Sequence, residues 1–189
     1  MAKILKLAAV LFVITAITGL ILGGVYTMTL EPISSAKEKE KMAALAETLP
    51  EASDFEEVDC PQDHSIIKEV NKGSVNGETV GYNLTVTPKG YGGLIEMVVG
   101  IDDEGKLIDI KILSHTETPG LGAKAADPAF SDQFEKKNVD RIVITKSAPT
   151  AENEVQAISG ATITSSAVAD GVNTALEYWS KNLKGEGNK

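Results

Sequence analysis

The first strongly hydrophobic stretch of the chain is long enough to cross a membrane. No charged residue occurs between Leu7 and Leu30, and about 20 consecutive apolar residues let a helix span the ~30 Å hydrocarbon core of a bilayer. Residues 1–30 are therefore predicted to be a short start followed by one transmembrane anchor. A cleaved signal peptide is the alternative, although the stretch is long for one and no clear small-x-small cleavage site follows it.

The pattern of residues 31–65 predicts a connecting segment between the anchor and the domain. Its first part, 33–49, is rich in helix formers and stops at Pro50, which indicates a short stalk helix that is not part of the core. Residues 51–65 are acidic and lack a periodic pattern, so we expect an irregular linker there.

The following residues, 66–184, are predicted to be a single domain, with a flexible tail at 185–189. Apolar and polar residues alternate from Val80 to Thr87, the pattern of a half-buried strand. Two further apolar runs, at 94–101 and 106–113, are separated by turn-rich segments. Three successive strands of this kind predict an antiparallel meander.

Helical patterns complete the domain. Asp127 suits an N-cap and Pro128 a first helical position, with Phe130 and Phe134 one turn apart on one face. Residues 141–146 predict another strand. The last helix carries an apolar stripe at spacings of three and four residues: Val168, Val172, Leu176, Trp179 and Leu183. The predicted fold class is α+β, with one N-terminal transmembrane helix before a single domain whose mainly antiparallel sheet is packed by helices.

Charge is unevenly distributed along the chain. The net charge is −9, yet residues 1–30 contain Lys3 and Lys6 and no acid, so the domain is strongly acidic. An acidic surface repels phosphate backbones, and we expect no nucleic-acid partner. The positive-inside tendency places the N-terminus in the cytoplasm and the domain on the outer or periplasmic face of the cell (inner) membrane.

Metal and disulfide chemistry find little support. Cys60 is the only cysteine, which excludes an intramolecular disulfide and a multi-cysteine cluster within this sequence. His64 and His115 are isolated and make a poor metal site. We predict no metal site and no catalytic acid or base, and the sequence assigns no role to these three residues.

A run of small and hydroxyl residues, Ile158 to Ser166, stands immediately before the last helix. The N-terminus of a helix suits a phosphate, because free N–H groups and the positive end of the dipole point at it. Gly160 and Ala161 would let a bulky group approach the backbone, and Thr162 offers an oxygen that can be esterified. The same residues would also serve as an ordinary N-cap turn without a ligand.

The tetrapeptide Ser-Gly-Ala-Thr at 159–162 resembles the flavinylation motif of the FMN-binding domain found in the Rnf G-type and Nqr C-type subunits. Two other segments, Gly90–Ile101 and His115–Gly122, resemble the same family in the same order. The resemblance extends over about residues 81–183 and includes the N-terminal anchor. The short length of the chain and the residues that make up these segments favour the Rnf G-type subunit.

The resemblance implies that a dedicated flavin transferase joins FMN through its phosphate to Thr162. It also implies that the loop Thr118–Gly122 lies against the isoalloxazine ring, with Thr118 as a hydrogen-bond partner and Leu121 as an apolar contact. Physically the same loop must be tight, and both of its glycines can take positive φ and expose backbone N–H groups. The alternative is a simple strand-to-helix turn without a ligand. The expected cofactor-binding residues are Ser159, Gly160, Ala161, Thr162, Thr164, Thr118, Gly120, Leu121 and Gly122.

Charged residues near these segments leave alternatives open. Lys124 could balance a phosphate charge or be solvated surface. The acid that often precedes the motif in the family is approximated here by Glu152 or Glu154.

The function implied by the resemblance is electron relay through covalent FMN in an ion-translocating ferredoxin:NAD oxidoreductase, an electron-transport translocase. No iron-sulfur cysteine cluster or glycine-rich dinucleotide fingerprint occurs in this sequence, so the complex is the enzyme. Its partners would be other integral membrane and redox subunits, the flavin transferase and the lipid bilayer. The alternatives are an Nqr C-type subunit of a sodium-pumping NADH:quinone reductase, and a non-redox single-pass assembly or scaffold protein.

Overall fold

The computed structural model describes residues 1–59 and 66–185. The chain divides into two compact units, Met1–Lys41 and Met42–Lys189. Cys60 and His64, for which the sequence assigned no role, lie outside the described residues.

The first unit consists of most of helix α1 (Ala2–Thr48), which continues through Pro32. This helix is long and apolar enough to cross a membrane, and none of its most apolar window is buried. The hydroxyls of Thr15, Thr18 and Thr29 each donate to a carbonyl one turn earlier. These polar groups are therefore satisfied without water, as a lipid environment requires.

The last turn of α1 belongs to the second unit and forms part of its core. The predicted helix end near Pro50 is confirmed, because α1 ends at Thr48. The expectation that this helix stays outside the core is wrong, since Ala44, Leu45 and Leu49 are each at most 2% exposed. Their apolar side chains gain from burial against the sheet.

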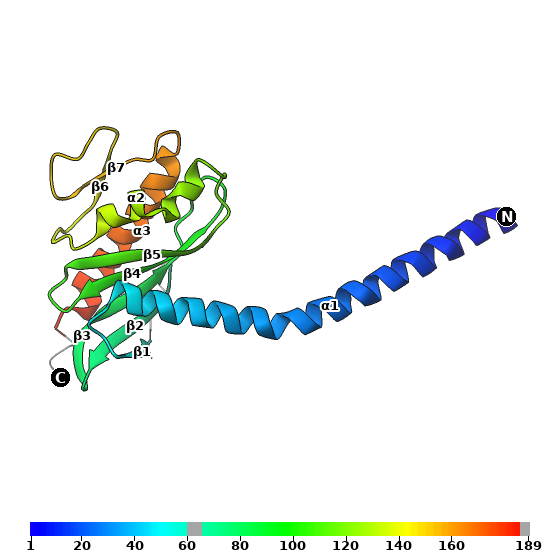
Figure 1. The fold of residues 1–189 in the computed structure, drawn as a ribbon, viewed down its shortest axis with the longest axis horizontal. Helices are drawn as coiled ribbons and strands as arrows, with labels where there is room; N and C mark the ends of the chain where they lie inside the picture. The colour runs from blue at the N-terminus through cyan, green and yellow to red at the C-terminus, as the bar shows by residue number, and fades with distance from the viewer. Residues whose placement is uncertain (60–65, 186–189) are drawn as a thin grey trace. The chain divides into compact units, whose positions relative to one another are not determined.

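Five strands form one antiparallel sheet in the order β1-β2-β3-β4-β5 (Figure 1). Their bounds are β1 Asp54–Val58, β2 Ile67–Val75, β3 Glu78–Val86, β4 Ile95–Asp102 and β5 Leu107–His115. The predicted meander is confirmed as β3, β4 and β5. The prediction of an irregular linker at 51–65 is wrong at 54–58, because these residues form β1 and pair with β2. β1 is an edge strand, and its exposed acids Glu56 and Glu57 are tolerated at such an edge.

Helix α3 (Thr162–Tyr178), continued by the π-helical turn η3 (Trp179–Leu183), runs across one face of the sheet (Figure 1). Its apolar stripe is buried as predicted. The packing is close, because a Cβ at Gly171 would lie 2.4 Å from Met97 Cε of β4. A glycine on the helix thus lets α3 approach the sheet.

The last turn of α1 covers the opposite face, so β3 is buried on both sides. Asn83 Nδ2 donates to Leu45 O at 3.0 Å, and the Thr48 hydroxyl lies 2.9 Å from Asn83 Oδ1. Both polar side chains are fully buried. The prediction of a half-buried β3 is therefore wrong, because a non-local segment covers the face that alternation assigned to solvent.

Short elements connect the sheet to α3: η1 Gly122–Ala126, α2 Pro128–Ser131, η2 Asp132–Phe134, β6 Val143–Thr145 and β7 Glu154–Gln156. Phe130 and Phe134 pack edge to face with ring centroids 5.4 Å apart, as their spacing predicted. Asp127 occupies the predicted N-cap position, but its side chain makes no capping hydrogen bond. The strand expected at 141–146 is confirmed as β6, which pairs in parallel with β7.

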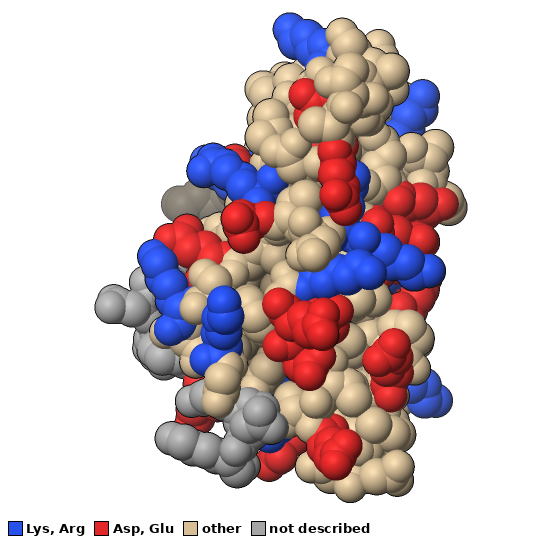
Figure 2. Space-filling model, turned by 90° about the vertical axis from the view of Figure 1, so that its left-hand side faces the viewer, with Lys and Arg blue, Asp and Glu red and all other residues tan. Residues whose placement is uncertain are grey.

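Charges of both signs share one face of the molecule. On the face shown in Figure 2, lysine and arginine side chains lie among aspartates and glutamates rather than in one basic patch.

Candidate functional site

Three segments that are distant in sequence converge on a cavity of about 450 Å³. They are the loop between β3 and β4, the loop after β5, and the start of α3. The cavity is lined by Tyr91, Glu117, Thr118, Leu121, Gly160, Ala161, Thr162, Ile163 and Thr164. This volume lies within the range of small-molecule sites, which is about 300–1,000 Å³.

The N-terminus of α3 opens into this cavity without a side-chain cap. Ala161 is the N-cap residue, and within the described chain no side chain bonds to the N–H groups of the first turn. Thr162, the first helical residue, is exposed. The Ser165 hydroxyl instead accepts the Ile158 N–H at 3.0 Å and donates to Ala161 O, which ties down the preceding loop. The helix end is thus available to an anion.

The loop after β5 is a tight turn built on Pro119 and Gly120. Leu121 N–H donates to Thr118 O at 3.1 Å, and Gly120 has a φ of 77°. Pro followed by a residue with positive φ is the pattern of a type II turn. Gly120 thus takes the positive φ that the sequence allowed for both glycines of this loop, whereas Gly122 does not.

Gly122 is instead required by close packing. A Cβ at this position would lie 2.3 Å from Glu117 Oε2 and 2.7 Å from Thr164 Oγ1. Contacts of this kind are far shorter than van der Waals separations, so a larger residue would force the segment after β5 away from the first turn of α3.

Glu117 joins all three segments and is only 6% exposed. Its Oε1 accepts the Gly92 N–H at 2.9 Å, and its Oε2 accepts the Thr164 hydroxyl at 2.7 Å. The backbone N–H of Glu117 lies 3.3 Å from His115 Nδ1. A buried carboxylate with both oxygens bonded holds the walls of the cavity in one geometry.

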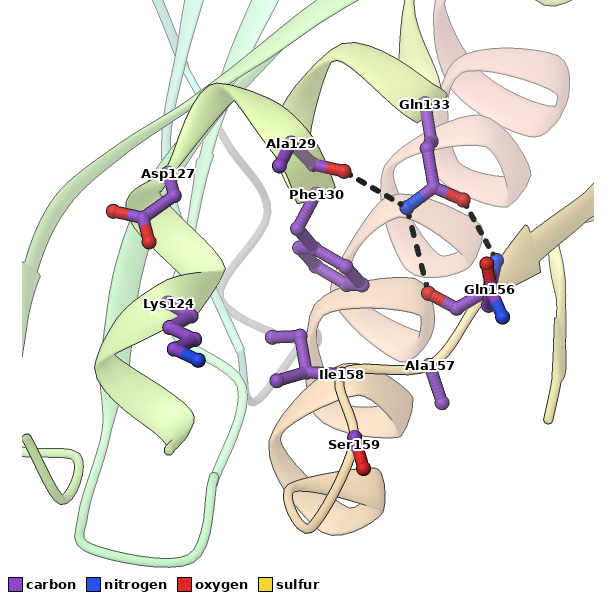
Figure 3. Close-up of a pocket in the computed structure, with 9 residues that line it drawn as sticks. All are labelled: Lys124, Asp127, Ala129, Phe130, Gln133, Gln156, Ala157, Ile158 and Ser159. Atoms are coloured by element: carbon purple, nitrogen blue, oxygen red, sulfur yellow. Dashed lines mark hydrogen bonds between the residues drawn. The ribbon is translucent and has the colours of Figure 1, made fainter. Parts of the chain in front are cut away.

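A second, smaller cavity of about 220 Å³ lies beside the segment that leads to Thr162 (Figure 3). At the edge of this cavity two hydrogen bonds join the Gln133 side chain to the backbone of Gln156. The Gln156 N–H donates to Gln133 Oε1 at 2.8 Å, and Gln133 Nε2 donates to Gln156 O at 3.4 Å. Lys124 and Ser159 line this second cavity. These two bonds fix the end of β7, where the loop before α3 begins.

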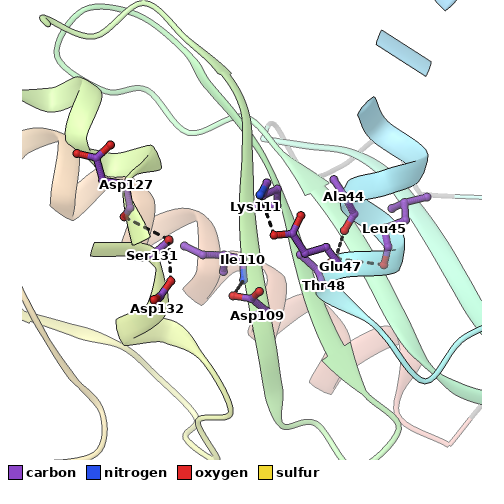
Figure 4. A network of polar contacts seen from close by, with 10 residues as sticks. All are labelled: Ala44, Leu45, Glu47, Thr48, Asp109, Ile110, Lys111, Asp127, Ser131 and Asp132. Carbon is purple, nitrogen blue, oxygen red and sulfur yellow. Dashed lines mark hydrogen bonds and ion pairs between the residues drawn. The ribbon is translucent and has the colours of Figure 1, made fainter. Parts of the chain in front are cut away.

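A marked electrostatic perturbation lies away from both cavities, on β5. Burial raises the pKa of half-buried Asp109 to about 6, and the carboxylates of Glu135, Glu47 and Asp132 add to the rise. The Ile110 N–H, which donates to Asp109 Oδ1, acts in the opposite direction. Nearby, Lys111 forms an ion pair with Glu47 at 2.8 Å (Figure 4).

Comparison with known proteins identifies the family. The chain is 37% identical over 162 residues to the G subunit of the proton-translocating ferredoxin:NAD(+) oxidoreductase complex of Clostridium ljungdahlii, covering 85% of this chain and 83% of that protein. It is 35% identical over 190 residues to the G subunit of the Na(+)-translocating complex of Acetobacterium woodii, covering 93% and 91%. The chain belongs to the G-subunit family of ion-translocating oxidoreductase complexes.

Two further likenesses agree with membership of the G-subunit family. The model of the FMN-binding domain family matches residues 90–177. The crystal structure of the C subunit of Na(+)-translocating NADH-quinone reductase from Parabacteroides distasonis has the same fold, with a TM-score of 0.63 and 18% identity over 84% of this chain and 98% of that chain. The residues matched by the FMN-binding domain model include every segment that lines the larger cavity.

The structure brings together most of the residues that the sequence of this G-subunit family member singled out. Those lining the larger cavity are Gly160, Ala161, Thr162, Thr164, Thr118 and Leu121. Gly120 and Gly122 shape the adjoining turn, and Ser159 lines the second cavity instead. The acids expected before the motif serve local loops, because Glu154 accepts the Thr150 N–H and Glu152 lies against Asn138.

Sequence reasoning missed three residues of the cavity: Tyr91, Glu117 and Ile163. All three lie inside segments that carried the family resemblance or flank the motif. Tyr91 stands between glycines, and Glu117 stands between threonines, so neither belongs to a periodic pattern that predicts its surroundings. Their role follows only from the convergence of the loops.

Proposed function

We propose that this chain is a membrane-anchored electron-relay flavoprotein of an ion-translocating ferredoxin:NAD(+) oxidoreductase complex, with FMN joined by a phosphoester to Thr162. Membership of the G-subunit family and the FMN-binding domain model support an FMN-dependent electron-transfer role. The observation that carries the covalent assignment is the exposed Thr162 at the uncapped N-terminus of α3, at the wall of the larger cavity.

The residues of this cavity fit FMN. Its phosphate suits the free N–H groups of the first turn of α3, where the helix dipole favours negative charge. A planar ring system suits the exposed apolar side chains at the cavity edge, because Tyr91, Leu121 and Ile163 are 73%, 44% and 58% exposed. Large apolar side chains left open to solvent around a cavity are typical of a binding site.

The attachment consists of one bond made and one bond broken. The Thr162 hydroxyl would be the acceptor: its oxygen would form a bond to the flavin phosphorus and lose its proton, with the pyrophosphate bond of a flavin dinucleotide breaking and AMP leaving. A flavin transferase would catalyse this exchange. The protein segment contributes an accessible hydroxyl and a loop fixed by Ser165.

FMN, once bound, would supply reversible uptake and release of electrons. In this chain Glu117 fixes the walls of the cavity, the turn at Pro119 and Gly120 shapes one side, and the N-terminus of α3 would favour the negative charge of the phosphate. No acid or base is required of the protein for electron relay.

The anchor and its orientation are part of the proposal. The length and exposure of α1 support a single membrane span. Lys3 and Lys6 before the span, against the acidic domain after it, support a cytoplasmic N-terminus and a domain on the outer or periplasmic face of the cell membrane. Other integral membrane and redox subunits of the complex would then contact this chain.

The deciding experiment is intact mass, with in-gel flavin fluorescence after denaturation, on protein purified from its own host beside a Thr162→Ala variant. We expect wild-type protein to carry the mass of one FMN less water, and fluorescence that survives denaturation. Both should vanish in Thr162→Ala, whereas the control Thr150→Ala should retain them. Native protein without added mass would overturn the covalent assignment and favour the scaffold alternative.

A further inference from the structure

Glu117 is a buried acid whose charge lies at the wall of the larger cavity. It is 6% exposed, and it lines the cavity together with Thr118 and Thr162. Removing a carboxylate from water is costly unless hydrogen bonds and charges compensate it. The fold therefore accepts a cost at this position that an apolar residue would avoid.

The compensation that the structure provides comes from neutral donors. The Gly92 N–H and the Thr164 hydroxyl each donate to one carboxylate oxygen. Thr164 stands in the first turn of α3, where the helix dipole also favours a negative charge. The ion pairs among the described residues join other acids, so no lysine or arginine in that part of the chain neutralises Glu117.

The surrounding backbone is shaped to admit this carboxylate. A Cβ at Gly90 would lie 2.3 Å from Glu117 Oε1, and a Cβ at Gly122 would lie 2.3 Å from Oε2. Two glycines in two different loops thus leave room for one acidic side chain. Both oxygens accept hydrogen bonds, so neither is left without a partner in this buried position.

We propose that Glu117 is a positioning residue that places a fixed negative charge beside the flavin and lowers its reduction potential. The inference rests on the proposed FMN site. Reduction adds electrons to the ring, and a nearby negative charge stabilises the oxidised ring relative to the reduced one. The hydrogen bonds that order the cavity thereby also hold this negative charge in place.

The test uses full-length wild-type protein, Glu117→Gln, and the matched control Glu104→Gln, all purified from the native host. Glutamine keeps the shape and removes the charge, and the control removes the same charge from the exposed turn after β4. Intact mass first measures the flavinylated fraction, and spectroelectrochemical titration then measures the midpoint potential of the bound flavin.

We expect the potential of Glu117→Gln to rise, changing the ratio of reduced to oxidised flavin by about tenfold or more, which is about 30 mV for a two-electron couple. Glu104→Gln should keep the wild-type potential. A purely structural role would alter the flavinylated fraction or the thermal stability and leave the potential unchanged. A flavinylated Glu117→Gln protein with the wild-type potential would therefore overturn the inference and leave the proposed function intact.

A second variant covers the case in which Glu117→Gln does not accumulate. Thr164→Val removes the hydroxyl that donates to Glu117 Oε2. This changes how the charge of the carboxylate is held, so the potential of the bound flavin should move away from the wild-type value. An unchanged potential in flavinylated Thr164→Val would count against the inference. Wild-type protein without flavin would overturn both the proposed function and this inference.

Discussion

The Thr164 hydroxyl donates a 2.7 Å hydrogen bond to Glu117 Oε2, joining the first turn of α3 to the loop after β5. The two residues are 47 positions apart in sequence, and both are buried. A bond to a buried carboxylate is stronger than one between neutral groups, because the donor meets a full charge in a medium of low polarity. The bond therefore holds together two of the three segments that form the larger cavity.

Replacing Gly122 by alanine should break this contact. The new Cβ would meet both Glu117 Oε2 and Thr164 Oγ1 at less than 3 Å, and overpacking of this kind costs about 1–3 kcal/mol. We expect a lower midpoint of thermal unfolding and a smaller flavinylated fraction, measured by circular dichroism and intact mass of the full-length protein in detergent. The companion variant Gly120→Asn should be milder, because asparagine tolerates positive φ and nothing lies within 4 Å of that position. Equal stability of Gly122→Ala and wild type would contradict the packing argument.

Loss of the Asn83 amide should destabilise the domain from the other face of the sheet. Asn83→Ala removes one donor to Leu45 O and one neighbour of the Thr48 hydroxyl, both in buried surroundings. Leu45 O keeps the Leu49 N–H and the Thr48 hydroxyl keeps Ala44 O, so the expected loss is about 0.5–1.5 kcal/mol for each hydrogen bond removed. Thermal unfolding should report this loss, while Ser147→Ala on an exposed loop should leave the midpoint within error. A fully stable Asn83→Ala variant would show that these hydrogen bonds do not stabilise the packing of α1 on the sheet.

Asp109 should make the domain less stable as pH rises. Its pKa in the folded protein is about 6, above the ordinary value of 3.8, so the folded state holds the proton more tightly than the unfolded state does. The protonated form is favoured by folding at low pH, and this advantage is lost between about pH 4 and pH 6. Asp109→Asn should therefore raise stability at pH 8, by about 1 kcal/mol after discounting for solvent screening, and should change it little at pH 4.

Thermal unfolding of Asp109→Asn at pH 4, 6 and 8 measures this effect, with Asp103→Asn as the exposed control. The difference between Asp109→Asn and wild type should grow with pH, and the difference for Asp103→Asn should not. A constant difference across the three values would mean that burial does not perturb the Asp109 carboxyl.

Local patterns predicted the elements whose neighbours are close in sequence. Strands β3, β4 and β5 follow one another as a meander, and the apolar stripe of α3 has one face to bury, so periodicity was sufficient for both. Alternation could not reveal that β3 is covered on its second face, because the cover comes from α1, a segment distant in sequence. Edge strand β1 was missed because its acids point to solvent and mask the pairing with β2.

For the candidate site too, local patterns were predicted and contacts between distant segments were not. The tetrapeptide at 159–162 was recognised as a local pattern. Its place at the start of the last helix is confirmed, but α3 begins at Thr162, so the expectation that the whole run 158–166 precedes the helix is wrong for 162–166. Glu117 was overlooked, although it stands in a recognised segment, because a glutamate next to threonines is usually exposed. Its burial depends on Gly92 and Thr164, which reach it only in the folded domain.

Ser165 offers a test of whether the loop before α3 must be ordered for flavin attachment. Its hydroxyl accepts the Ile158 N–H and donates to Ala161 O, both at 3.0 Å, so Ser165→Ala would free the loop on both sides of Gly160. An Ile158 N–H left unpaired and buried lowers the free energy of unfolding by about 1–3 kcal/mol. The loop can reduce this cost by loosening so that the N–H reaches water, which makes the loop less ordered. We expect Ser165→Ala to be flavinylated more slowly by the transferase in a time course followed by intact mass, while α3 retains its helical signal. The adjacent variant Ser166→Ala, which makes neither of these two bonds, serves as the control and should react at the wild-type rate. Equal rates for Ser165→Ala and Ser166→Ala would mean that the transferase itself imposes the reactive shape on this loop.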